Sequence, residues 1–140
     1  MSHTSGKRRV VTVAAAALAA TSLALAAAPV ASAATGKNGA LESREFGLYY
    51  NTNRGGCVFD LLVEDTNFSG DYFKGSGCNG LGQSTNDNAA SYWNRDTYTW
   101  YVYTDKSAGG VEGWLDGNTY SNASEDFKNE VSSSYYWDAN

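Results

Sequence analysis

Histidine, proline and methionine are almost missing from this chain, which has one of each, all three within the first 33 residues. If those residues are removed, no imidazole remains. A chain without imidazole cannot build Ser-His-Asp or Cys-His catalysis, nor a histidine-ligated zinc site. Carboxylates are plentiful, but no pair has a spacing that suggests acid–base catalysis. We therefore expect that the protein is not an enzyme.

Charge is missing from a long stretch near the N-terminus. Lys7, Arg8 and Arg9 precede an alanine-rich apolar run that ends in Ala-Ser-Ala. A basic start, an apolar centre and a small-residue end are typical of a secretory signal peptide, so we expect residues 1–33 to be cleaved off between Ala33 and Ala34. A membrane-anchoring helix is the alternative, but proline and hydroxyl residues interrupt the run. The expected location is extracellular, without membrane attachment after cleavage.

Basic residues are scarce in what remains. Cleavage leaves 107 residues with seven basic and fifteen acidic side chains, a net charge of −8. So acidic a chain is poorly suited to bind nucleic acid or an anionic membrane surface. Its length fits one domain with a modest core, and we expect a monomer.

Cysteine is limited to Cys57 and Cys78. In an exported protein, an even pair without Cys-x-x-Cys spacing indicates a structural disulfide. Two reactive thiols are the alternative, but no histidine and little basic charge are available to activate them. The sequence alone leaves open whether the bridge joins one chain or two.

Helical periodicity is absent as well. From Glu45 onward, short runs of Tyr, Trp, Phe, Val and Thr are separated by clusters of Gly, Asn, Asp and Ser, which predicts an all-β domain over residues 45–140. Residues 34–44 are small and polar, and we expect a flexible leader there. The predicted strands cover residues 46–51, 57–64, 71–74, 90–95, 98–104, 111–115 and 133–137.

The domain contains an internal repeat. Residues 49–56 align with residues 103–110 at an offset of 54, and residues 86–93 align with residues 129–136 at an offset of 43. Each unit has a strand ending in an aromatic residue, a polar turn closed by glycine, and a later polar loop that leads into another strand. This order, found twice, predicts two Greek-key motifs, at about 45–96 and 97–138. Chance similarity in a chain rich in Gly, Asn and Tyr is the alternative.

These repeated motifs resemble those of βγ-crystallins. More specifically, GLYYNTNRGGCVFDLLVEDTNFSGDYFKGSG followed by NDNAASYWNRDT resembles secreted actinobacterial proteins of the metalloproteinase-inhibitor family, which have the βγ-crystallin fold. The resemblance covers about residues 45–137. It implies a βγ-crystallin-like sandwich of two Greek keys, an extracellular protease as partner, and inhibition of zinc metalloendopeptidases by a rigid loop.

The resemblance also implies metal sites, each combining the start of one polar loop with a Ser or Thr of the other. One site would join Asn86, Asp87 and the Asn88 carbonyl to Ser133, and such oxygen ligands suit Ca²⁺. The second site would need a side-chain oxygen at Ala90 and so departs from the pattern. We expect no required cofactor and at most one weak Ca²⁺ site. Loops satisfied by their own Asx and Ser hydrogen bonds are the alternative.

Cys57, Val58 and Phe59 are the first candidates for the inhibitory contact, because they place an apolar residue beside the predicted disulfide. The loop Gly75–Gly82 around Cys78 is the second candidate. Val58 and Phe59 filling the core of a strand is the alternative. Two other functions stay open: a calcium-binding or structural module, and a glycan- or surface-binding, toxin-like domain that presents aromatic side chains.

Overall fold

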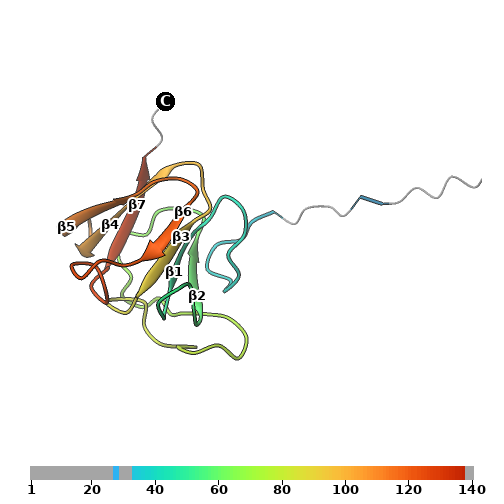
Figure 1. The fold of residues 1–140 in the computed structure, drawn as a ribbon, viewed down its shortest axis with the longest axis horizontal. Coiled ribbons are helices and arrows are strands. Elements are labelled where there is room, and N and C mark those ends of the chain that lie inside the picture. The colour runs from blue at the N-terminus through green and yellow to red at the C-terminus, as the bar shows by residue number, and fades with distance from the viewer. Residues whose placement is uncertain (1–26, 29–32, 138–140) are drawn as a thin grey trace, which may run out of the picture. The chain divides into compact units, whose positions relative to one another are not determined.

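Seven β-strands make up the fold in the computed structural model, which describes residues 27, 28 and 33–137 (Figure 1). Most of the predicted signal peptide lies outside the described residues. Among the described residues, no helix is long and apolar enough to cross a membrane. The strands are β1 (Phe46–Tyr49), β2 (Val58–Leu61), β3 (Ser91–Asn94), β4 (Thr99–Asp105), β5 (Gly109–Leu115), β6 (Thr119–Asn122) and β7 (Ser133–Trp137).

The strands form two antiparallel sheets that exchange segments. One sheet has the order β2-β1-β3-β6 and the other has the order β5-β4-β7 (Figure 1). β6 belongs to the second half of the domain but pairs with β3, where Tyr92 lies opposite Ser121. In return, Asp65 of the first half forms a bridge with Ser134 of β7. This reciprocal exchange confirms the predicted sandwich of two Greek keys.

The predicted strands overlap β1 to β5 and β7, and two details differ. Residues 71–74 make only isolated bridges, between Val58 and Lys74 and between Tyr72 and Ser84. β6 was not predicted, because it is short and polar and three of its four residues are exposed.

The core lies between the sheets and is mainly aromatic. Phe46 of β1 stacks on Trp100 of β4 with ring centroids 4.9 Å apart, and both side chains are fully buried. Phe59 and Phe68 meet edge to face at 5.1 Å. The indole N–H of Trp100 donates to Asp96 Oδ2 at 3.1 Å, so this buried donor is not left unpaired.

Residues 34–44, expected to be a flexible leader, are packed on the domain. The backbone N–H groups of Asn38 and Gly39 donate to the carboxylate of buried Asp60 at 3.0 and 2.7 Å. Leu41 lies against β1. The segment therefore covers the outer face of β1 and β2, while Phe59 and Leu61 face the core, so that all four residues of β2 are buried.

Candidate functional site

A buried serine holds one hairpin in each half of the domain. The Ser91 hydroxyl donates to the Asn51 carbonyl at 2.6 Å, and the Ser133 hydroxyl donates to the Asp105 carbonyl at 2.7 Å. Each hydroxyl also accepts a backbone N–H from its hairpin. The two hairpins are 54 residues apart, as predicted, whereas the two serines are 42 residues apart rather than 43.

The polar loops before these serines pair with each other through a local twofold arrangement. Asp87 N–H donates to the Val131 carbonyl at 3.1 Å, and Asn129 N–H donates to the Ala89 carbonyl at 2.8 Å. Asp87 and Asn129 both adopt the left-handed conformation, with φ of 57° and 60°. Short polar side chains tolerate this conformation, which explains why Asp and Asn occupy these two equivalent positions.

The offset between the two polar loops is one residue shorter than predicted, which changes the serine that lies at the predicted metal site. Ser132, not Ser133, faces Asp87, and its hydroxyl donates to Asp87 Oδ1 at 2.7 Å. Ser133 is buried, with its hydroxyl bonded to the hairpin. Asn86 lies beside Asp87, donating to Oδ2 at 3.0 Å, while the Asn88 amide donates to the backbone of its own loop. Three consecutive serines made the alignment ambiguous by one residue.

These loops and the second hairpin line an open polar groove of about 720 Å³, whose charged residues are Asp87, Asp105, Glu130 and the cation Lys106. The Asp87 carboxylate and the Ser132 hydroxyl that donates to it are oxygen groups of the kind that Ca²⁺ prefers. The equivalent groove in the other half is lined by Ala90 and Lys128 and by no carboxylate. The two grooves therefore differ in their carboxylates, since a lysine lines each of them.

The segment first expected to contact a protease is buried. Cys57, Val58 and Phe59 are 1%, 6% and 2% exposed. β2 pairs with β1 on one side and forms a bridge to Lys74 on the other, so both edges at Val58 are occupied. The expectation is corrected: these residues cannot reach an enzyme in this fold, and they fill the core instead.

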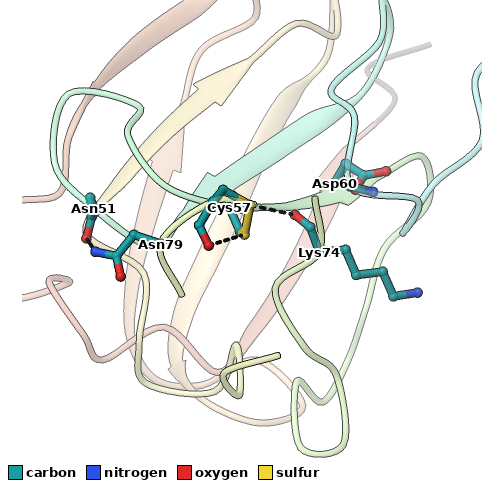
Figure 2. Close-up of a disulfide and its surroundings, with 7 residues drawn as sticks. Asn51, Cys57, Asp60, Lys74 and Asn79 are labelled. Atoms are coloured by element: carbon teal, nitrogen blue, oxygen red, sulfur yellow. Dashed lines mark hydrogen bonds between the residues drawn. A yellow bond between two sulfur atoms is a disulfide. The ribbon is translucent and has the colours of Figure 1, made fainter. Parts of the chain in front are cut away.

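The second candidate, the loop Gly75–Gly82, projects from the sheets and is tied to β2. The disulfide between Cys57 and Cys78 is confirmed and lies within one chain (Figure 2). Beside it, the backbone N–H of Cys57 donates to the Asn79 carbonyl at 2.9 Å. The Asn79 side chain donates to Asn51 Oδ1 at 3.3 Å and so joins the loop to the first hairpin (Figure 2).

The remaining contacts of the loop fix its far end. Phe73 exchanges backbone hydrogen bonds of 3.0 and 2.9 Å with residues 82 and 83. Gly80 lies so close to the ring of Tyr50 that a methyl group at this position would overlap the ring, and its φ of 86° also requires glycine. Between these anchors, Leu81 is 54% exposed. The loop is thus exposed but held at both ends and in its middle.

The sheet β5-β4-β7 has an aromatic outer face. Trp114, Tyr101 and Tyr135 lie opposite one another across its three strands. Trp114 and Trp137 are 67% and 69% exposed. A second group of aromatic side chains lies on the other sheet, where Tyr120 is 57% exposed and meets Trp93 edge to face at 6.0 Å.

Solved βγ-crystallin structures are similar to this chain. One, from work on the evolution of the eye-lens βγ-crystallin domain fold, is 15% identical with a TM-score of 0.57, covering 72% of this chain and 93% of its own. A βγ-crystallin from Ciona intestinalis is 18% identical with a TM-score of 0.51, covering 66% and 99%. A βγ-crystallin domain from Flavobacterium johnsoniae is 22% identical with a TM-score of 0.52, covering 67% and 94%. At such identities the likeness shows the fold alone: the protein is of the βγ-crystallin fold class.

The family model described as peptidase inhibitor family I36 matches residues 42–115, just over half of the chain. This protein belongs to that family, as the sequence resemblance predicted. The matched region contains the first Greek key, the disulfide and the whole exposed loop. No curated protein matches the chain.

Proposed function

We propose that the protein is an exported inhibitor of thermolysin-type zinc endopeptidases that places the loop Gly75–Gly82 in the enzyme's cleft. Membership of a peptidase inhibitor family supports a protease as the partner, and the disulfide fits export from the cell. The main support is the exposed loop itself, which is fixed by the disulfide and by backbone hydrogen bonds. A loop that is already ordered loses little conformational entropy when it binds.

The composition of the loop supports this class of enzyme. The sequence GSGCNGLG contains neither Lys nor Arg, so it offers no cation to the Asp-lined specificity pocket of a trypsin-like protease. Its one large apolar residue, Leu81, points into solvent. Thermolysin-type enzymes favour an apolar residue on the C-terminal side of the bond that they cleave. We infer that Leu81 enters that pocket.

A matched pair of substitutions tests the contact. Leu81 and Val111 are both 54% exposed, but Val111 lies on β5, outside the loop. The oxidised protein is titrated against a thermolysin-type enzyme, with subtilisin as a serine-protease control. Burying one apolar side chain contributes about 1.5–3 kcal/mol, so Leu81→Asp is expected to weaken inhibition of the zinc enzyme about 10- to 100-fold or more. Val111→Asp is expected to leave it unchanged.

Equal inhibition by the two variants would show that the loop is not the contact. Inhibition of subtilisin as strong as that of the zinc enzyme would contradict the proposed target class. The melting temperatures of both variants are measured alongside, because each change is at an exposed site and is expected to leave the fold intact.

Calcium binding in the groove around Asp87 is a second proposed property, supported by the Asp87 carboxylate beside the Ser132 hydroxyl. Extracellular calcium modules typically bind with Kd of about 10⁻⁴–10⁻³ M, and we expect a site of this weak kind. Calorimetric titration with CaCl₂ measures it: Asp87→Asn is expected to lower the number of bound ions by one. An unchanged number in this variant would contradict the proposal.

A further inference from the structure

Three carboxylates meet where the N-terminal segment crosses the first sheet, far in the sequence from the polar loops. Glu42 belongs to the segment 34–44, Glu45 directly precedes β1, and Asp60 lies on β2 near the disulfide (Figure 2). One carboxylate oxygen from each residue lies within 4.8 Å of the other two.

One oxygen of this cluster is buried without a partner. Glu45 is 0% exposed, and its Oε1 has no hydrogen bond, while its Oε2 accepts the backbone N–H of Glu42 at 2.7 Å. Asp60 is also 0% exposed. A buried acceptor without a partner destabilises the fold, and more so when it is charged, so an unpaired carboxylate oxygen in this position calls for a ligand.

No basic side chain of the described residues neutralises the cluster. The ammonium group of Lys37 is paired with Asp65 and Asp71, and these are the salt bridges found within residues 33–137. The guanidinium of Arg95, the residue after β3, donates to the Leu41 carbonyl. Backbone N–H groups of Asn38, Gly39 and Glu42 donate to the cluster, but no cation of the described residues balances its charge.

We propose that Glu42, Glu45 and Asp60 bind a calcium ion that fastens the N-terminal segment to β1 and β2. The donors are all oxygens, which favours a hard cation, and Ca²⁺ takes about six to eight oxygen ligands at 2.3–2.6 Å. Glu45 Oε1 is unpaired, the other five carboxylate oxygens accept hydrogen bonds but keep a further lone pair for an ion, and Glu42 is the one that is partly exposed. The ion would give Glu45 Oε1 its missing partner and remove the repulsion with its two neighbours.

This site is separate from the groove around Asp87 and does not depend on protease inhibition. The two sites share no residue, since the groove is lined by the polar loops and the second hairpin. A substitution in one site therefore serves as the control for the other.

Glu42→Gln tests the site, because it removes a charge from the partly exposed ligand and preserves the side chain's size. The full chain is titrated with CaCl₂ by calorimetry, and its melting temperature is recorded with CaCl₂ and with EDTA. We expect calcium to raise the melting temperature of the wild type. Glu42→Gln should lose part of this rise and weaken the corresponding binding at least tenfold, while Asp87→Asn should retain that part. A Glu42→Gln variant that binds as many ions and gains as much stability as the wild type would overturn the proposal.

Hydrogen exchange on the wild type gives a test that needs no variant. The Asn38 and Gly39 amides donate to Asp60, so they should exchange more slowly with calcium than with EDTA. If calcium leaves both amide rates unchanged, a proton rather than a cation occupies the cluster, and the proposal is wrong.

Discussion

Replacing Cys57 and Cys78 together by alanine is expected to lower the free energy of unfolding by about 3–4 kcal/mol. The two residues are 21 apart in sequence. Closing a loop of that length contributes about 3 kcal/mol in the chain-entropy model. Cys57 is 1% exposed in the core, and loss of its sulfur leaves a small cavity that adds about 1 kcal/mol. A domain of this size has about 5–15 kcal/mol in total, so the variant should still fold.

Thermal unfolding followed by circular dichroism measures the effect. At about 4 °C per kcal/mol for a domain of about 100 residues, the melting temperature should fall by about 12–16 °C. A reducing agent provides the control, because it should lower the melting temperature of the wild type and leave that of the variant unchanged. A decrease of less than about 3 °C would refute the reasoning, since the bridge would then neither restrict the unfolded chain nor support the core.

Three further predictions follow from single contacts. Ser91→Ala and Ser133→Ala should each cost about 1–3 kcal/mol in urea unfolding, because each leaves a hairpin carbonyl and N–H without their partner; a cost below about 0.3 kcal/mol would contradict the locking role. Gly80→Ala should destabilise the protein and weaken inhibition because it overlaps an aromatic ring, whereas Gly77→Ala, with open space around it, should cost only about 1 kcal/mol or less; equal effects would argue against the packed loop. In calcium-free buffer, burial in the folded state raises the pKa of Glu45 from 4.5 to about 7, so the folded protein holds a proton that the unfolded chain releases. The free energy of unfolding should therefore fall by about 1–2 kcal/mol between pH 4.5 and 7. Glu45→Gln should remove this pH dependence.

Much of the fold could be predicted from the sequence because the repeat has physical causes. The serines that bond the hairpins and the left-handed Asp and Asn recur because each half solves the same backbone problem. The offset between the two loops was wrong by one residue, since three adjacent serines are chemically alike. All three serines are buried, and Ser133 differs from Ser132 in that its hydroxyl donates to the Asp105 carbonyl of the hairpin rather than to Asp87.

The candidate site was less predictable because burial on β2 depends on a segment that looks disordered. Residues 34–44 are small and polar, but their N–H groups bind the Asp60 carboxylate and their backbone covers β2. That cover lies against Val58, whereas Phe59 is part of the core between the sheets, and the loop around Cys78 stays exposed. The cluster of Glu42, Glu45 and Asp60 could not be predicted from the sequence either. Asp60 comes from β2, and no sequence spacing indicates that it lies beside the other two carboxylates.

Stoichiometric titration of a thermolysin-type zinc endopeptidase with the oxidised wild-type protein tests the central claim most directly. Enzyme activity should fall linearly with added protein and vanish near one equivalent, while subtilisin under the same conditions stays active. Full activity of the zinc enzyme at a tenfold molar excess of correctly folded protein would contradict the proposed inhibition.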